Sequence, residues 1–298
     1  MKLTRLALAA SLALASPLAA AQLQPQAGAD DSEIVVEGRK ERQSQIQRFV
    51  GALTETHFRG QIARFEWEVC PVALGMPENQ VRRFEERIRQ VGRAAGVPIA
   101  EPGCDANAIV IVTPEKRATM RMLKREYPEL FRTELRERIR PDFDAPVSAW
   151  QVQGRLTRDG LAVGVVDSAM GTYYQSEVTD SSSRLTPATR PHFKASVLVV
   201  DLAALRGLTL TQFADYAAMR LYAHTQPSRL DRTTVPTILN IVDAPMGAEV
   251  PLTLTQWDLG FLRALYGSAE NRYAEQQRRE MRRRLEADLD SGQRIESD

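Results

Sequence analysis

The stretch ASVLVVDLAALRGLTLTQFADYAAMRLY, residues 195–222, decides the fold that we predict. Its first six residues carry no charge and are mostly β-branched or aliphatic, which indicates a strand buried on both faces. Thr209 and Gln212 then have the spacing of a capping box, so a helix should begin at Leu210. A buried strand followed at once by a buried helix indicates that sheet and helices share one core.

Helices are also predicted elsewhere by apolar residues at helical spacing. One begins near Glu41, a second lies between Pro77 and Gly96, and a third follows Pro114. Thr255 gives the capping signal for a fourth. Together with the helix after Leu210, these segments could cover a sheet.

Strands are predicted in three further places. Residues 64–69 alternate between polar and apolar side chains, which is typical of a half-buried strand, and residues 108–112 are apolar throughout. Residues 150–174 resemble a hairpin that turns at 158–160, because Asp-Gly supplies the positive φ that such turns need. We therefore predict an α+β fold, a mixed sheet packed against helices.

The domain organisation follows from composition. Residues 41–267 form the predicted globular domain, with a candidate sub-boundary in the charged stretch 132–146. Residues 268–298 form a charged tail, helical from Asn271, protruding and frayed at its end. Arg278 to Arg284 within it is offset by eight acidic residues from Glu270 onward, so we interpret it as the solvated side of a helix. With a net charge of +1, the chain lacks the basic face of a nucleic-acid-binding protein.

The N-terminus has the pattern of a secretory signal peptide. Lys2 and Arg5 precede an apolar run from Leu6 to Leu18, and small residues follow up to Ala21, after which we place cleavage. The run is shorter than the roughly 20 residues that span a membrane. No later stretch is long and apolar enough to span, so we expect a soluble, periplasmic or secreted protein without a transmembrane segment.

The lead-in after the predicted cleavage site, residues 22–40, is polar and flexible except for one short strand. That strand, Ile34–Arg39, resembles the segment near the mature N-terminus of outer-membrane TonB-dependent receptors, which such receptors offer to an energising partner by strand addition. An ordinary edge strand is the alternative interpretation.

The two cysteines, Cys70 and Cys104, are expected to form a disulfide in an oxidising compartment. Two buried free thiols, or a metal pair, are the alternatives. Two thiolates without nearby histidines make a poor zinc site, since zinc usually takes four ligands.

A family resemblance rests on the segment LTLTQWDLGFLRALY, residues 252–266, together with the strand and helix of residues 195–222. This region, roughly residues 195–267, is similar to the end of zincin-type metallopeptidase domains of uncharacterised exported bacterial proteins. In an active zincin the helix carries HExxH, whose two histidines bind one zinc while the glutamate activates its water. Residues 211–220 contain no histidine, so the resemblance implies a degenerate zincin-like fold, and we predict neither a metal nor a cofactor.

The remaining candidate catalytic residues are Ser168, Asp215, His192 and His224. Ser168 lacks the first glycine of a GxSxG elbow, and His57, like the other two histidines, has no partner at metal-ligand spacing. Asp215 and Arg220 lie five positions apart on the helix, so they should face different ways.

No complete catalytic constellation results, which favours a non-catalytic binding or structural module of the envelope. The alternatives are a hydrolase with an unrecognised site, centred on Ser168 or on dispersed carboxylates, and an interaction protein that offers Ile34–Gly38 or its tail to an envelope protein partner. A deep polar pocket that gathers His192 or His224 with acids would favour the hydrolase.

Overall fold

The structure, a computed structural model, describes residues 30–54, 60–175, 183, 186–230, 235–245 and 247–292, with the backbone alone for 30–37 and 39. The chain divides into two units, residues 1–40 and 41–298. The predicted signal peptide and its cleavage after Ala21 lie outside the described residues.

Residues 30–40, the described part of the first unit, are helical and belong to α1 (Asp30–Leu53). The prediction of a strand at Ile34–Arg39 was therefore wrong. Valine and isoleucine reduce helix stability by only about 0.5 kcal/mol each, and a helix that already exists gains one hydrogen bond for each residue added. A short β-branched run beside a helix can therefore be helical.

A four-stranded mixed sheet organises the second unit, in the order β1-β2-β6-β3. Neighbouring strands β1, β2 and β6 are parallel, and β3 is antiparallel to β6. The strands are β1 (Pro71–Leu74), β2 (Ala108–Thr113), β3 (Val147–Thr157) and β6 (Thr189–Asp201), with a separate hairpin of β4 (Gly164–Ser168) and β5 (Gly171–Gln175). The predicted mixed sheet and α+β class are confirmed.

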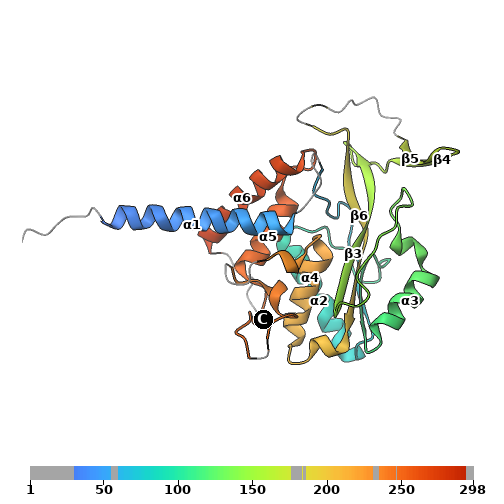
Figure 1. Cartoon of the computed structure of the whole chain (residues 1–298), viewed down its shortest axis with the longest axis horizontal. Helices are drawn as coiled ribbons and strands as arrows, with labels where there is room; N and C mark the ends of the chain where they lie inside the picture. Colours follow the sequence, from blue (N-terminus) through green and yellow to red (C-terminus); the bar gives the residue numbers. More distant parts are fainter. Residues whose placement is uncertain are drawn as a thin grey trace, which may run out of the picture. The chain divides into compact units, whose positions relative to one another are not determined.

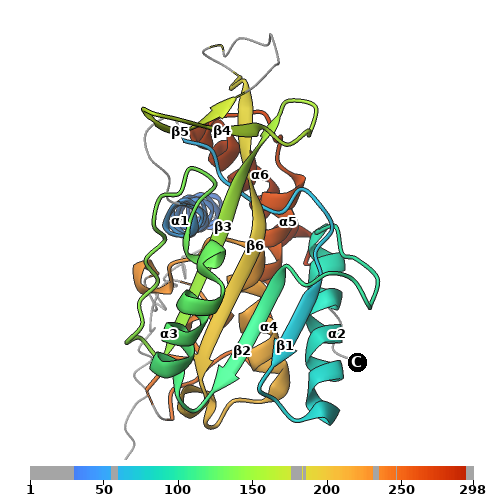
Figure 2. The same cartoon turned by 90° about the vertical axis from the view of Figure 1, so that its right-hand side faces the viewer.

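The helices are α2 (Glu78–Ala95), α3 (Lys116–Glu126), α4 (Leu210–Tyr222), α5 (Gln256–Gly267) and α6 (Ala274–Ser291), with short 3-10 turns η1 (Pro128–Phe131), η2 (Leu202–Leu205), η3 (Pro227–Arg229) and η4 (Ile238–Asn240). Figures 1 and 2 show α2, α4 and α5 on one face of the sheet and α3 on the other. No described helix has the length and apolar character needed to cross a membrane.

The central strand β6 contributes to two apolar clusters, one on each face of the sheet. Leu198 and Val200 belong to the large core with α2, α4 and α5, whereas Val197 and Val199 pack in a smaller cluster with Met120 of α3. This alternation follows from the two-residue period of a strand. The burial on both faces that the apolar composition of residues 195–200 predicts is therefore present.

Residues 64–69 were predicted as a strand, but they make only two isolated bridges. The carbonyl of Arg64 accepts from Phe193 N–H at 2.9 Å, and Val69 then bonds to the segment after α2, donating to Pro98 O at 2.7 Å. Trp67, between them, is 46% exposed. The chain thus leaves β6 before a strand can form, and β1 begins only at Pro71.

The predicted hairpin of residues 150–174 is only partly correct. The turn is present, with Gly160 at φ 85° and its N–H donating to Thr157 O at 3.1 Å. However, β3 pairs along its length with β6, and the segment after the turn makes one bridge, Leu156–Ala162. The hairpin itself is formed by β4 and β5.

The charged C-terminal segment, predicted to protrude from Asn271 onward, instead packs along α5 through α6. Met281 and Leu285 of α6 are fully buried. Arg278 Nε donates to Thr54 O at the end of α1, at 3.1 Å. One face of α6 is therefore part of the core, although its sequence is dominated by charge.

The predicted disulfide between Cys70 and Cys104 is present, with the Cα atoms 5.8 Å apart. It joins the residue before β1 to the loop that leads into β2. A disulfide of this kind is compatible with a secreted protein, since such bonds persist in oxidising compartments.

Candidate functional site

Helix α4 lies within the core, and every side chain from Gln212 to Tyr222 is buried. Its predicted capping box is confirmed: Gln212 N–H donates to Thr209 Oγ1 at 3.1 Å, and Thr209 N–H donates to Gln212 Oε1 at 2.9 Å. A helix enclosed along its length does not present a catalytic face to solvent.

Asp215 of α4 is fully buried and accepts four hydrogen bonds. Arg87 of α2 donates through Nε at 2.7 Å and Nη2 at 3.1 Å, one to each carboxylate oxygen. Thr253 Oγ1 and Leu254 N–H donate to Oδ2 at 2.7 and 2.6 Å. The carboxylate therefore joins α2, α4 and the segment before α5, an arrangement that suits a structural role.

Arg220 and His224 lie at the other end of α4. Arg220 Nη1 donates to the Tyr216 hydroxyl at 2.8 Å, so Arg220 does not pair with Asp215, as their spacing predicted. Burial raises the pKa of that hydroxyl, against the opposing effect of the Arg220 charge. His224 is exposed, and its Nδ1 lies 2.6 Å from Gln151 Oε1.

A cavity of about 370 Å³ lies beside His224 and includes Gln61, Gln153 and Arg155 in its lining. No described residue that lines it carries a carboxyl group. A hydrolase built around His224 would need an acid or a nucleophile there. This part of the structure therefore does not favour the hydrolase hypothesis.

His192 on β6 is 1% exposed, and its ring lies against Trp67 with centroids 4.5 Å apart. Burial lowers the pKa of His192 to about 4, so the imidazole is neutral at physiological pH. Its Nδ1 has no hydrogen-bond partner among the described residues.

Ser168 lies at the end of β4, in the turn that joins β4 to β5. Its hydroxyl donates to Gly171 O at 3.2 Å and accepts from Met170 N–H at 3.1 Å. These are the bonds of a serine that closes a hairpin turn. Ser168, His192, Asp215 and His224 therefore have different partners from different parts of the fold.

Metal ligands do not gather in the described part of the chain, where no group of three or more His, Cys, Asp or Glu side chains could hold an ion. His57 lies outside the described residues. Cys70 and Cys104, joined in the disulfide, offer no thiolate.

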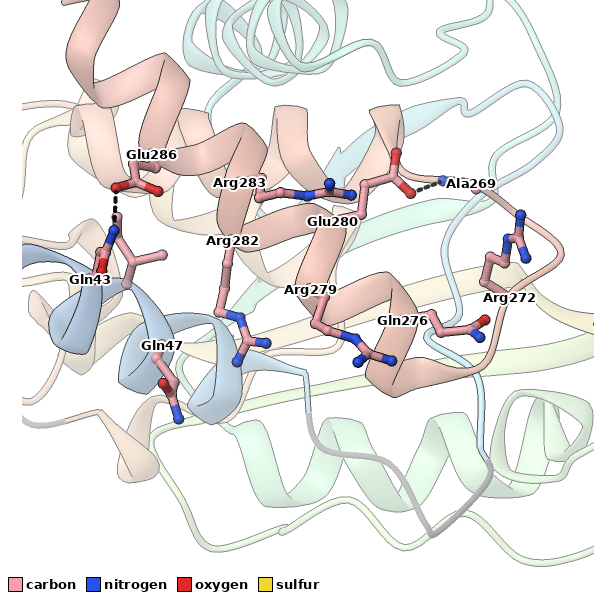
Figure 3. A pocket seen from close by; sticks show the side chains of 11 residues that line it. Gln43, Gln47, Ala269, Arg272, Gln276, Arg279, Glu280, Arg282, Arg283 and Glu286 are labelled. Atoms are coloured by element: carbon pink, nitrogen blue, oxygen red, sulfur yellow. Dashed lines mark hydrogen bonds between the residues drawn. The ribbon is translucent and has the colours of Figure 1, made fainter. Parts of the chain in front are cut away.

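The strongest candidate site is a groove between the second half of α1 and helix α6, with a volume of about 690 Å³. This lies within the range of roughly 300–1,000 Å³ that is typical of ligand sites. We call it the α1–α6 groove. Its lining residues, shown in Figure 3, are Gln43, Ile46, Gln47, Ala269, Arg272, Gln276, Arg279, Glu280, Arg282, Arg283 and Glu286.

The arginines of the groove have few partners. Among the described residues, no acceptor or ion-pair partner accompanies the side chains of Arg272 and Arg282. Arg279 has only an exposed contact of 3.8 Å with Glu275, which contributes little. The groove thus holds guanidinium groups whose hydrogen-bonding capacity is unused.

The two acids of the groove are already engaged. Glu280 accepts from Arg284 Nη2 at 2.9 Å and from Ala269 N–H at 3.1 Å. Partial burial acts to raise the pKa of Glu280, but these hydrogen bonds and the charges of Arg284 and Arg283 lower it. Glu286 accepts from Gln43 at 3.1 Å. The excess charge of the groove is positive.

Three glutamine side chains add neutral hydrogen-bonding groups to this surface. Gln47 is exposed on α1, and Gln43 lies one turn before it. Gln276 Oε1 is buried and has no hydrogen-bond partner among the residues that the structure describes, which is costly unless a ligand or water supplies a donor. In Figure 3, Arg282 extends from α6 toward α1.

The groove was not predicted from the sequence, in which residues 278–284 have the pattern of a solvated helix face. A signal was nevertheless present: Met281 and Leu285, at helical spacing, show which face of α6 is buried. Arg279, Arg282 and Arg283 lie beside that face. The sequence did not show, however, that α1 lies opposite α6 across the groove.

Comparison of the chain with protein-family models, with curated proteins and with solved structures gave no match in any of the three. The zincin-like resemblance therefore stays a hypothesis.

Proposed function

We propose that this chain is a non-catalytic, extracytoplasmic binding protein that takes an acidic polypeptide segment in the α1–α6 groove. The observation that carries the proposal is a groove of about 690 Å³ lined by four arginines, of which Arg272 and Arg282 have no hydrogen-bond or ion-pair partner among the described residues. Arginine clusters are a recurring means of binding acidic motifs.

A polypeptide fits this surface better than a simple anion, because the groove offers two kinds of hydrogen-bonding group. Each guanidinium can bind a carboxylate through two parallel N–H bonds. The buried oxygen of Gln276 needs a donor, which a peptide N–H supplies, and the amide of Gln47 can bond a peptide carbonyl. A bare phosphate or sulfate would leave the Gln276 oxygen without a donor.

The proposal that the protein is non-catalytic rests on two candidate catalytic side chains, which are hydrogen-bonded within the protein. The four hydrogen bonds to Asp215 tie helices together, and Ser168 closes a turn. This is consistent with a zincin-like fold in which the former catalytic helix has become part of the core. The hydrolase hypothesis has no comparable support from the described residues.

Placement outside the cytoplasm is supported by the Cys70–Cys104 disulfide and by the signal-peptide pattern that ends at Ala21. We propose the periplasm or the medium, with an envelope protein as the source of the acidic segment.

The test is isothermal titration calorimetry with a short peptide of alternating glutamate and glycine. Peptides with glutamine or lysine in place of glutamate are the ligand controls. We expect saturable binding of the acidic peptide alone, weakened at high salt because exposed charges are screened beyond about 10 Å at 0.1 M. Mass spectrometry of the recovered peptide checks that it has not been cleaved.

The decisive variant replaces Arg279, Arg282 and Arg283 with glutamine. Its matched control replaces three exposed arginines of α2, Arg82, Arg83 and Arg93, so the net charge changes equally. If each lost guanidinium removes about 1 kcal/mol, affinity should fall at least tenfold in the groove variant and little in the control. Equal losses in both, or no saturable binding by the native chain, would overturn the proposal. Cleavage of the peptide would revive the hydrolase hypothesis.

A further inference from the structure

A second cavity, of about 530 Å³, lies on the opposite face of the sheet, beside α3. Four cationic side chains line it: Lys124 of α3 and Arg132, Arg138 and Arg140 of the segment that follows η1. None of the described residues that line it is acidic. We call it the α3 cavity, and it shares no lining residue with the α1–α6 groove.

The charges of the α3 cavity are unused by the protein. Across the described parts of the chain, the side chains of Arg132, Arg138 and Arg140 have neither a hydrogen-bond acceptor nor an ion-pair partner. The ammonium group of Lys124 lies 5.9 Å from the centre of the Phe143 ring, a cation–π contact that leaves its hydrogen-bonding capacity free. Like charges gathered in this way repel one another, so an anion in the cavity would relieve the repulsion.

The walls of the cavity are apolar and aromatic. Phe131 is buried, and its ring lies 6.3 Å from that of Phe143, measured between centroids. Phe131 also packs against Trp150 of β3, at 5.1 Å. A ligand in the cavity would therefore contact both aromatic side chains, which are apolar, and the exposed guanidinium groups of the arginines.

The cavity is held in shape by bonds to the body of the protein. Lys116 Nζ donates to the carbonyls of Asp142 and Phe143, each at 3.2 Å, and Trp150 Nε1 donates to Leu130 O at 2.7 Å. Because these bonds fix the walls before a ligand arrives, the ordering cost of binding would fall mainly on the exposed cationic side chains.

The tight turn of residues 133–137 brings two of the arginines together. Arg136 has φ 61°, the only positive φ at a non-glycine residue in the described part of the chain. Its N–H donates to Thr133 O at 2.9 Å, and Arg132 and Arg138 form an antiparallel bridge. The turn thus places two positive charges side by side. Their repulsion destabilises the fold, and a bound anion would offset it.

We propose that the α3 cavity binds a small amphipathic anion, an aromatic carboxylate or phosphate whose flat apolar body lies against Phe131 and Phe143. Its anionic group would be held by Arg138 and Arg140, with Lys124 and Arg132 adding charge. Burial of an apolar body and a charge-assisted hydrogen bond contribute together at such a site. The inference is independent of the acidic-peptide proposal.

The probe is 1-naphthoate, titrated calorimetrically into the full chain. We expect saturable binding, with 1-naphthylmethanol, which lacks the charge, and acetate, which lacks the rings, each at least tenfold weaker. Equal binding of acetate would refute the role of the aromatic wall, and equal binding of the alcohol would refute the role of the cations. No saturable binding of naphthoate or of naphthyl phosphate would overturn the proposal outright.

The site is located by a double variant, Arg138→Gln with Arg140→Gln. Its control, Arg117→Gln with Arg125→Gln, removes two exposed arginines of α3 that lie outside the cavity and pair with Asp144 and Glu126. We expect at least a tenfold loss of naphthoate affinity in the first and less than a twofold change in the second. Equal effects would overturn the proposal. The groove variant with Arg279, Arg282 and Arg283 replaced should bind naphthoate normally. A failure of the naphthoate proposal can therefore be distinguished from a failure of the acidic-peptide proposal.

Discussion

Replacement of Arg87 by methionine tests whether the buried carboxylate of Asp215 is structural. The change removes two of its four hydrogen bonds and the nearest positive charge, while Asp215 stays fully buried. Removing one partner of a buried pair costs about 3–5 kcal/mol, because the remaining charge is left without compensation. For a unit of this size that corresponds to a fall in Tm of roughly 6–20 °C.

Replacement of Asp215 by asparagine shows the contribution of the other partner of the pair. The Arg87 side chain is 12% exposed, so in Asp215→Asn its guanidinium can turn toward water, and we expect a smaller loss of about 1–3 kcal/mol. In the double variant Arg87→Met with Asp215→Leu no buried charge remains. It should be less destabilised than the sum of the single variants Arg87→Met and Asp215→Leu, with a coupling energy of about 2 kcal/mol.

The assay is thermal and urea unfolding followed by circular dichroism. Arg93→Met is the control, since Arg93 lies on the same helix and pairs with Glu86 at an exposed position, where a change should stay within about 0.5 kcal/mol. If Arg87→Met were no worse than Arg93→Met, the structural interpretation would be refuted. Asp215→Asn with native stability but altered binding or cleavage of a peptide would instead indicate a functional carboxylate.

Three further outcomes follow from burial and backbone geometry. Loss of the Cys70–Cys104 disulfide, by reduction or by Cys70→Ala with Cys104→Ala, should cost about 4 kcal/mol, given the 34-residue separation; an unchanged Tm under reducing conditions would contradict this. The pKa of His192, about 4 in the folded chain against 6.5 unfolded, means that the folded state binds fewer protons between these values. The free energy of unfolding should therefore fall by about 3 kcal/mol as pH falls through that window, and His192→Gln should flatten the urea midpoints measured across it. Gly75 and Gly96 both have φ 79°, but a Cβ at Gly75 would overlap a backbone carbonyl of β2 whereas one at Gly96 meets nothing within 4 Å, so Gly75→Ala should lower Tm clearly more than Gly96→Ala.

The parts of the fold that the sequence predicted are those whose signals are local. The capping boxes at Thr209 and Thr255 need only residues three apart, and both are present. The strands at 108–112 and 195–200 needed only their apolar composition. Each of these signals is complete within a few residues, so no knowledge of neighbours was required.

The errors have the opposite character, because each depended on a neighbour that the sequence does not identify. Residues 64–69 have a strand-like pattern, yet they make a single backbone hydrogen bond to β6, at Arg64. Residues 34–39 have strand-like composition, yet they are part of α1. An alternating polar and apolar pattern and a high β-propensity show that a segment can form a strand. Whether it does so depends on a neighbouring strand with which its backbone can pair.

The candidate sites were hidden for a related reason, which concerns charge. A net charge of +1 predicts no strongly basic surface. Net charge, however, is a sum over the chain, and a ligand meets only the side chains that share one concavity. In the α1–α6 groove the carboxylates of Glu280 and Glu286 are hydrogen-bonded to Arg284 and Gln43, and none of the described residues that line the α3 cavity is acidic. Two positively charged cavities can therefore exist on a chain that is almost neutral, and only the structure separates the arginines that are paired from those that are free.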